Sequence, residues 1–280
     1  VSYHGTSFFY GNPLAAHPGF DGNGRFVSKG YHYRRSAWFG CACCPPNIAR
    51  MIAQFPSFIY ATKGTVLAVH HFAQSVACVT VAGRTVKIAQ KTDYPWDGKT
   101  TLAIDPEHAD VWTLAVRIPS WCRRATLNIN GKAVRIASIA NKGYAYITRE
   151  WRKGDCVTLT LPMPVERIEA HPAARHDCGR VALQRGPVVY CFEQVDNGAN
   201  LNDLLLDTTA PFVVQRGRKG ILAGVPLIHA RALKRDMSAW RGELYRARPS
   251  RRTTQKIIAI PYFLWANRSP GEMLVWMRST

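Results

Sequence analysis

Three cysteines fall within four residues of this sequence, Cys41, Cys43 and Cys44, and Pro45 and Pro46 follow them directly. Thiolates are both nucleophiles and zinc ligands, and a helix N-terminus favours the thiolate form. Adjacent Cys43 and Cys44 could both reach one zinc ion at about 2.3 Å, although two sulfurs leave a four-coordinate site incomplete. The cluster therefore favours a metal site or a nucleophilic thiol; the alternative is a group of buried structural thiols or an oxidisable cluster.

The residues that follow the cluster predict a short helix that would position it. Ile48, Met51, Ile52 and Phe55 repeat at i, i+3, i+4 and i+7, which places them on one helical face. Proline is tolerated in the first turn, where its missing N–H has no partner to lose. Because one face of this helix is apolar, we expect it to pack against something.

The rest of the chain predicts strands, after a first section of about 44 residues that is typical of long loops. Short β-branched and aromatic stretches bounded by turn residues are typical of β-sandwiches. Asn130-Gly131 lies at the centre of a predicted hairpin. The first block of strands is predicted at 65–72, 75–81, 84–88, 100–104, 112–118, 126–134, 144–148 and 156–161, and the second at 180–184, 188–192, 213–215, 225–230, 256–260 and 273–277.

Other residues with ligand chemistry have simpler interpretations. His70 and His71 are neighbours on a predicted strand and point to opposite faces. His171, His176, Asp177 and Cys178 lie in a proline-rich stretch between the two blocks, where we favour an interdomain connection over a metal site. Four further cysteines are expected to be small core residues: Cys78, Cys122, Cys156 and Cys191.

The charge is strongly basic, with 37 Lys and Arg against 18 Asp and Glu and a formal net charge of +19. Residues 211–280 hold 14 of the basic and 3 of the acidic residues. A basic patch can indicate nucleic-acid binding, but no helix-turn-helix, zinc-finger or RNA-binding signature accompanies it. We therefore expect an arginine-rich surface and no nucleic-acid partner. No apolar run reaches the length of a membrane span, so we also expect no membrane partner.

Eight short motifs follow one another along the chain: Phe9–Leu14, Trp38–Arg50, Val116–Trp121, Asn130–Gly131, Glu150–Asp155, Leu161–Pro164, Arg185–Tyr190 and Ile260–Arg268. In this order they resemble glycoside hydrolase family 127, the β-L-arabinofuranosidases. The motifs are distributed over nearly the whole chain, which makes the resemblance far more specific than the cysteine spacing alone.

The resemblance implies a mainly β fold, in which two β-sandwich domains follow a loop-and-helix remnant of an α/α barrel catalytic domain. The boundaries would be 1–60 for the remnant with the cysteine cluster, 61–163 for the middle sandwich and 164–280 for the C-terminal sandwich. It also implies a retaining glycosidase in which a zinc-bound cysteine attacks the anomeric carbon and a glutamic acid protonates the leaving oxygen. The substrate would be an arabinofuranoside or a related plant-glycan oligosaccharide.

Matched residue by residue, the resemblance implies that Cys43 is the nucleophile and a zinc ligand, and that Cys44 is a second ligand. Tyr10 and Asn12 would line the sugar site, with loop packing as the alternative. Trp38 would stack on a sugar face, with a core position beside the helix as the alternative.

The sequence departs from the family in one respect that affects its chemistry. The family's acid/base Glu and its other zinc ligands, a Glu and a Cys, precede the cluster, but here no Glu occurs before Glu107. We therefore expect the C-terminal portion of such an enzyme, with most of the barrel missing, inactive by itself and with an incomplete zinc site.

Two other functions stay open from the sequence: a non-catalytic β-sandwich module that binds carbohydrate or protein, and, less favoured, a basic nucleic-acid-binding domain. Zinc–thiolate chemistry favours a reducing compartment, so we expect a cytoplasmic location. No pattern in the sequence predicts an oligomeric state.

Overall fold

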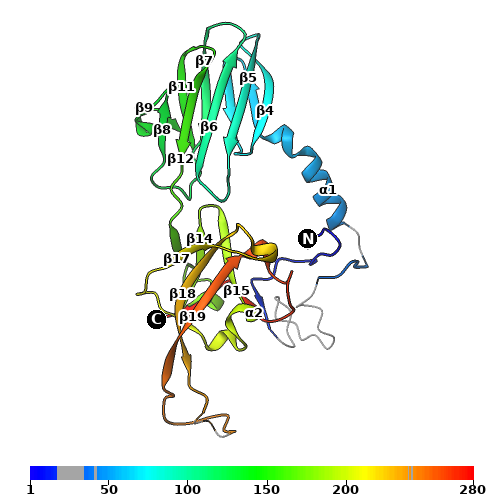
Figure 1. Cartoon of the computed structure of the whole chain (residues 1–280), viewed down its shortest axis with the longest axis vertical. Coiled ribbons are helices and arrows are strands. Elements are labelled where there is room, and N and C mark those ends of the chain that lie inside the picture. Colours follow the sequence, from blue (N-terminus) through cyan, green and yellow to red (C-terminus); the bar gives the residue numbers. More distant parts are fainter. Residues whose placement is uncertain (18–34, 41–42, 239, 241) are drawn as a thin grey trace. The chain divides into compact units, whose positions relative to one another are not determined.

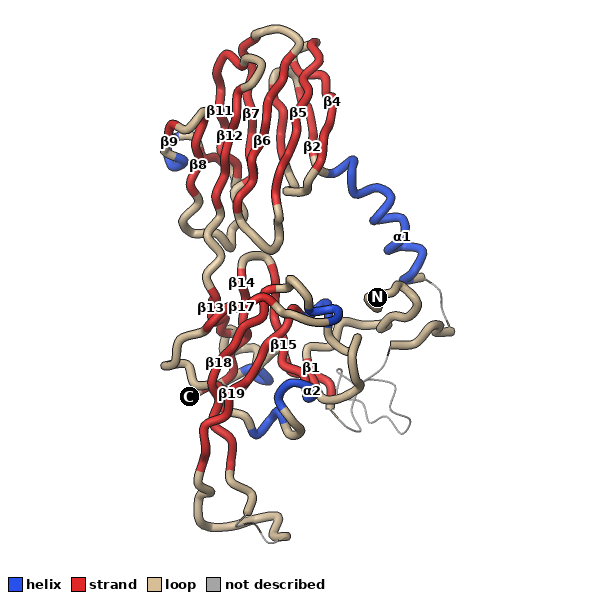
Figure 2. The backbone as a smooth tube through the Cα atoms, viewed as in Figure 1, coloured by secondary structure: helices blue, strands red, loops and turns tan. Residues whose placement is uncertain are grey.

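The computed structural model describes residues 1–17, 35–40, 43–238, 240 and 242–280, so Cys41 lies outside the described residues. Its contacts divide the chain into two compact units. One is Cys43–Pro164, and the other combines Val1–Ala42 with Val165–Thr280. Figures 1 and 2 show both, and each is described by itself below.

The unit Cys43–Pro164 begins with helix α1 (Cys44–Gln54) and a 3₁₀ turn (Phe55–Phe58) and continues as two sheets. The strand orders are β10-β11-β7-β3-β2 and β4-β5-β6-β12-β8-β9. All described neighbours in these sheets are antiparallel except β3 and β7. The strands are β2 (Tyr60–Lys63), β3 (Val66–Val69), β4 (Ser75–Val81), β5 (Arg84–Thr92), β6 (Lys99–Pro106), β7 (Asp110–Arg117), β8 (Thr126–Ile129), β9 (Lys132–Val134), β10 (Ala140–Asn141), β11 (Tyr144–Trp151) and β12 (Asp155–Thr160), with a 3₁₀ turn at Ile136–Ser138.

One apolar core lies between these two sheets. Trp112 and Trp151 are both buried in it, with ring centroids 5.2 Å apart, and Nε1 of Trp151 donates a hydrogen bond of 3.0 Å to the Trp112 carbonyl. Leu102 and Leu159, from the other sheet, are fully buried in the same core. Alternate residues of β6 and β12 are buried, as expected for a sheet with one covered face. The sandwich predicted for this part of the chain agrees with this arrangement.

The second unit holds a ten-stranded sheet whose pairings close into a ring. Strand β15 pairs with both β14 and β19, and β21 pairs with both β14 and β16, so the ring runs β14-β15-β19-β18-β16-β21 and returns to β14. The strands are β1 (Ala15–Ala16), β13 (Val165–Glu169), β14 (Arg180–Arg185), β15 (Val188–Glu193), β16 (Leu205–Leu206), β17 (Val213–Arg216), β18 (Pro226–Arg235), β19 (Arg252–Pro261), β20 (Met273–Leu274) and β21 (Met277–Ser279).

A separate core fills this ring and contains Leu183, Phe192, Ile228, Ile257 and Met277. The closed pairing is barrel-like and differs from the open sandwich that the strand pattern predicts. Closure depends on partners that are distant in sequence, and strand periodicity does not reveal them. The prediction of a mainly β fold is confirmed.

Helices are few in the described part of the chain. Besides α1 and the two 3₁₀ turns already named, they are α2 (Gln194–Asn197) and 3₁₀ turns at Arg175–Asp177, Leu201–Asp203, Gly220–Leu222 and Tyr262–Leu264. A remnant of an α/α barrel is therefore not established by the fold and stays a prediction. None of the described helices is long and apolar enough to cross a membrane.

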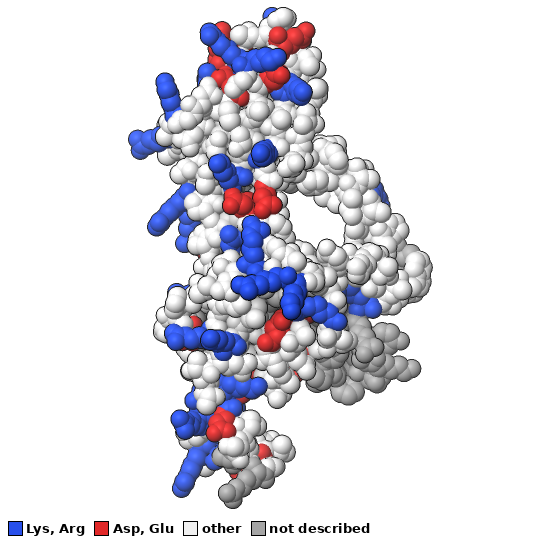
Figure 3. Space-filling view, in the orientation of Figure 1, with Lys and Arg blue, Asp and Glu red and all other residues white. Residues whose placement is uncertain are grey.

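The basic residues are widely distributed. Lys and Arg side chains lie on the visible face of both units, with fewer acidic side chains among them (Figure 3). Most described ion pairs are at least partly exposed, as for Arg152 with Glu150 at 2.7 Å. An exposed pair of this kind contributes little to stability.

Candidate functional site

Cys43 and Cys44 lie at the start of α1, where the sequence predicts them. Cys43 is the N-cap residue, with φ −69° and ψ −32°, and Cys44 is the first helical residue. Pro45 and Pro46 carry no N–H, so only Cys44 and Asn47 can donate from the first four amides of the helix. The N-terminal turn therefore presents two neighbouring thiols and few amide donors.

The two sulfurs are held close together. Cys43 Sγ and Cys44 Sγ are 3.6 Å apart, well beyond the disulfide bond length of about 2.05 Å. Two thiolates about 2.3 Å from one tetrahedral zinc ion would lie about 3.8 Å apart, so the observed separation fits a shared metal. Cys43 is exposed and Cys44 is partly buried. The pair can therefore bind a metal and leave one sulfur accessible to a substrate.

The pair does not form a complete metal centre within the described residues. Across 1–17, 35–40, 43–238, 240 and 242–280, no group of three or more His, Cys, Asp or Glu residues could hold a metal ion. The stretch with His171, His176, Asp177 and Cys178 is included in this finding. Its His171 Nδ1 accepts a hydrogen bond from the Ala173 amide, 3.1 Å away.

Most of the predicted apolar face of helix α1 is exposed to solvent. It has no buried residue, and Met51 and Ile52 are 54% and 70% exposed. Phe55, predicted as the last residue of the apolar face, begins the following 3₁₀ turn. Its ring centroid lies 5.5 Å from that of His71. Within the described part of the chain, the expectation that this face packs against something is therefore met only at Phe55, which is partly buried.

Tyr10, Asn12 and Trp38 belong to the other unit. Tyr10 is 52% exposed and its ring centroid lies 5.5 Å from that of Phe39, while Asn12 is also exposed. Trp38 is 64% exposed. Ser36 fixes its backbone, because the Ser36 hydroxyl donates to the Trp38 carbonyl at 2.6 Å.

Segment 1–17 itself is attached to the C-terminal β-structure within that unit. Strand β1 pairs with β20, and the Phe9 and Trp265 rings stack with centroids 4.3 Å apart. The sequence gives no local signal for these contacts, because about 250 residues separate the partners. Phe9 and Trp265 do belong to motifs shared with the resembled family, Phe9–Leu14 and Ile260–Arg268.

The four cysteines predicted in the core differ in burial, and His70 contacts a tyrosine. Cys122 and Cys191 are buried, as predicted, and burial raises the pKa of the Cys191 thiol. Cys78 is exposed on the outer face of β4, an edge strand, so the core prediction is wrong for it. Cys156 is only partly buried. His70 Nδ1 lies 2.7 Å from the Tyr144 hydroxyl, and burial lowers the pKa of His70.

Comparison with known proteins gives three family profiles that follow one another along the chain. Residues 1–57 match the β-L-arabinofuranosidase GH127 catalytic domain, residues 66–163 the GH127 middle domain and residues 165–278 the glycoside hydrolase family 127 C-terminal domain. The cysteine pair lies in the part that matches the catalytic domain.

Individual relatives agree with these profiles. A non-reducing end β-L-arabinofuranosidase of Bifidobacterium longum subsp. longum is 34% identical over 99% of this chain and 43% of its own length. The crystal structure of a GH127 β-L-arabinofuranosidase from Geobacillus stearothermophilus T6 matches with a TM-score of 0.92 and 47% identity, over 98% of this chain and 43% of that one. A second solved GH127 β-arabinofuranosidase matches with a TM-score of 0.86 and 32% identity, over 100% and 43%.

The chain thus spans less than half the length of the relatives it matches. The three profiles nevertheless cover it almost from end to end, in the order catalytic, middle and C-terminal. On these matches, the chain belongs to glycoside hydrolase family 127.

Proposed function

We propose that this chain supplies the nucleophile end of a retaining β-L-arabinofuranosidase, with Cys43 as nucleophile and zinc ligand and Cys44 as a second zinc ligand. The observation that carries the proposal is the Sγ–Sγ separation of 3.6 Å at the start of α1, within the catalytic-domain match. The relatives' descriptions as β-L-arabinofuranosidases support the same reaction class.

The donor set fits zinc, since adjacent thiolates at this separation suit one tetrahedral ion. A bound zinc ion keeps the Cys43 sulfur ionised at neutral pH. Both thiols must be reduced for this chemistry, which favours a reducing compartment such as the cytoplasm.

The reaction assigned to Cys43 has two displacements. Its sulfur donates an electron pair to the anomeric carbon as the glycosidic C–O bond breaks, and a carboxylic acid gives its proton to the leaving oxygen. Water then attacks the same carbon, loses a proton to that carboxylate and releases the Cys43 thiolate. Two inversions give net retention, and the covalent intermediate divides one difficult step into two easier ones.

The sugar would be recognised by Tyr10, Asn12 and Trp38. All three are exposed, and Trp38 offers an aromatic face of the kind that stacks on sugar rings. An arabinofuranoside or a related plant-glycan oligosaccharide is the proposed substrate, and hydrolysis of a terminal arabinofuranosyl residue is the proposed reaction.

We further propose that the acid/base carboxylate and the remaining zinc ligands come from catalytic-domain residues that this chain does not supply. The exposed apolar residues of α1 support this division of the site. Residues 1–60 would be a remnant of an α/α barrel, followed by a middle domain at 61–163 and a C-terminal domain at 164–280.

Zinc competition tests the ligand pair. With the reduced 280-residue chain and a chromophoric chelator, we expect weak zinc binding that Cys43→Ala and Cys44→Ala each reduce at least tenfold, as expected for loss of one of few ligands. Cys78→Ala is the matched control, because Cys78 is an exposed thiol far along the chain. Equal effects of all three substitutions would contradict the proposed site.

Mass spectrometry tests the nucleophile. After incubation with an activated aryl β-L-arabinofuranoside, we expect any covalent pentosyl adduct on Cys43 and none on Cys44 or Cys78. We expect no steady turnover, because the chain supplies no acid/base group for it. If the chain shows steady turnover and Cys43→Ala abolishes it, the proposal of an incomplete site is wrong, but the assignment of Cys43 as nucleophile stands. An adduct on another residue would contradict that assignment.

A further inference from the structure

Segment 3–16 follows the C-terminal β-structure and is attached to it at several points. The Tyr3 amide donates to Oδ1 of Asn267 at 2.7 Å, and the Phe9 ring stacks on Trp265 with an interplanar angle of 1°. The Tyr262 hydroxyl donates to the Pro13 carbonyl at 2.8 Å. Beyond it, the Val275 amide donates to the Leu14 carbonyl and β1 pairs with β20.

Three exposed residues, Tyr10, Gly11 and Asn12, lie between the attachment at Phe9 and the attachment at Pro13. Phe39 limits the ring of Tyr10 from one side, with centroids 5.5 Å apart. Since both ends of this short stretch are held, its backbone has few conformations left. The positions of Tyr10 and Asn12 therefore depend on where Trp265 and Tyr262 lie.

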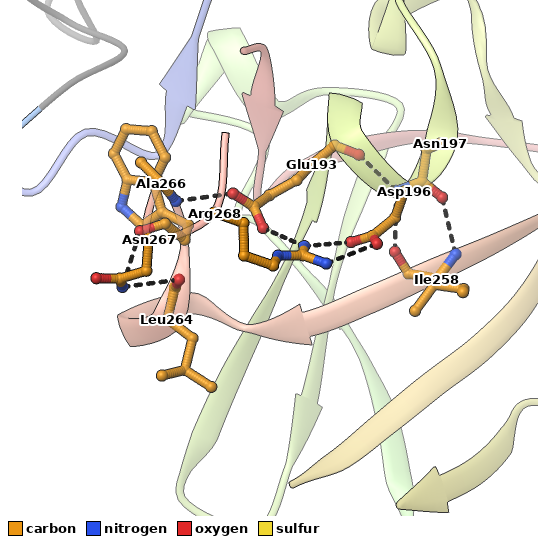
Figure 4. Close-up of polar contacts among 9 residues, drawn as sticks. Glu193, Asp196, Asn197, Ile258, Leu264, Ala266, Asn267 and Arg268 are labelled. Carbon is orange, nitrogen blue, oxygen red and sulfur yellow. Dashed lines mark hydrogen bonds and ion pairs between the residues drawn. The ribbon is translucent and has the colours of Figure 1, made fainter. Parts of the chain in front are cut away.

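Trp265, Tyr262 and Asn267 come from one turn after β19, and a buried ion-pair cluster holds that turn. The Arg268 guanidinium donates to Glu193 Oε2 at 2.5 Å and to both Asp196 oxygens, and Glu193 Oε1 accepts the Ala266 amide at 2.7 Å (Figure 4). The Glu193 and Asp196 side chains are 4% and 15% exposed. A planar guanidinium that binds two carboxylates fixes direction as well as distance.

The turn needs such an anchor because its backbone is unusual. Ala266 has φ +52°, in the left-handed region that residues other than glycine rarely adopt. The hydrogen bond from its amide to Glu193 holds this conformation. Burial raises the pKa of Tyr262 to about 12, so its hydroxyl keeps its proton and stays a donor to Pro13.

We infer that Arg268 is a positioning residue for the sugar site: through the turn 262–267, it sets the conformation of residues 9–13 and hence the sugar affinity of Tyr10 and Asn12. The inference rests on the proposed function for its last step, because that step takes Tyr10 and Asn12 as sugar contacts. The C-terminal domain then takes part in substrate binding without touching the substrate.

Hydrogen exchange of the 280-residue chain, followed by mass spectrometry, tests the positioning. We expect Tyr262→Phe to accelerate exchange of the hydrogen-bonded amides of residues 6–16, among them the Phe8 amide that donates to the Ser36 carbonyl at 2.9 Å, by about 3- to 10-fold, the effect of one net hydrogen bond. Arg268→Gln should have at least that effect. The matched control is Tyr190→Phe, which removes a hydroxyl that donates to the Pro226 carbonyl at 3.1 Å in the same unit.

Binding of methyl β-L-arabinofuranoside, measured by NMR titration, tests the consequence. We expect Tyr262→Phe to raise the Kd for the sugar about 3- to 10-fold. Tyr190→Phe should leave this Kd unchanged, and the two variants are compared at equal denaturation midpoints. Arg268→Lys should recover only part of the sugar affinity that Arg268→Gln loses, because an ammonium group cannot bind both carboxylates as a fork.

The outcomes separate the two hypotheses. Unchanged exchange of the hydrogen-bonded amides of residues 6–16 in both Tyr262→Phe and Arg268→Gln would overturn the positioning role, as would an acceleration spread evenly over the C-terminal domain. Local acceleration in a protein that does not bind the sugar would keep the positioning and overturn Tyr10 and Asn12 as sugar contacts. Local acceleration with an unchanged sugar Kd would overturn the link to affinity.

Discussion

Replacement of Asp155 by alanine should destabilise the Cys43–Pro164 unit by about 2–4 kcal/mol. The Asp155 side chain is 8% exposed, and its oxygens accept hydrogen bonds from Asn130 Nδ2 at 2.7 Å and from the Arg152 amide at 2.8 Å. A buried donor that loses its acceptor costs about 1–3 kcal/mol. Two donors are affected, and rehydration of Asn130, which is exposed, reduces the total.

Urea unfolding followed by far-UV circular dichroism measures this difference. Asp105→Ala is the matched control, since Asp105 pairs with Lys153 at 3.9 Å and is 41% exposed, so its loss should cost less than about 0.5 kcal/mol. A double-mutant cycle with Asn130→Gly should give a coupling of about 1 kcal/mol. Glycine is chosen there because Asn130 has φ +49°, which alanine would strain.

The pH dependence gives an independent check of the same carboxylate. Burial by itself would raise the pKa of Asp155, but the hydrogen bonds from Asn130 and Arg152 and the nearby arginines lower it below its usual value. Its stabilising effect is therefore present above the unfolded pKa of about 3.9 and is lost as the pH falls through the lower folded pKa. The reasoning fails if Asp155→Ala costs no more than Asp105→Ala at pH 7, or if the two substitutions of the cycle are additive.

Two further substitutions probe the same unit. Gly98→Ala should lower the free energy of unfolding by more than about 2 kcal/mol, because a Cβ there would lie 1.9 Å from the Leu161 carbonyl oxygen. Gly11→Ala is the control, because nothing lies within 4 Å of a Cβ at that position. Similar urea unfolding midpoints for the two variants would contradict this close packing at Gly98. Trp151→Phe should cost about 1–3 kcal/mol, since it removes the buried hydrogen bond to the Trp112 carbonyl; a change below about 0.5 kcal/mol in thermal unfolding would show that this bond contributes little.

Local patterns predicted most of the strands. The predicted strand 75–81 is β4 residue for residue, and 188–192 falls one residue short of β15. The Asn130-Gly131 turn has φ values of 49° and 80°, as a tight hairpin requires. These features depend on side-chain alternation and turn chemistry, which act between neighbours in the chain. Short strands such as β16 (Leu205–Leu206) were missed, because two residues carry no period.

The cysteine pair was also predictable from the sequence. Adjacency forces Cys43 and Cys44 close together, and the prolines after them mark the helix start, so the 3.6 Å separation needs little tertiary information. The exposure of Cys78 was not predictable, because strand alternation does not say which face of an edge strand is covered.

The sequence by itself determined most of the strands, the hairpin turn and the thiol pair, because each depends on residues a few positions apart. Only the tertiary structure decided the ring closure through β21, the attachment of segment 3–16 and the cluster of Glu193, Asp196 and Arg268. These contacts join residues about 70 to 260 positions apart, and their stability comes from burial and from the mutual satisfaction of charges. Neither is visible until the chain has folded.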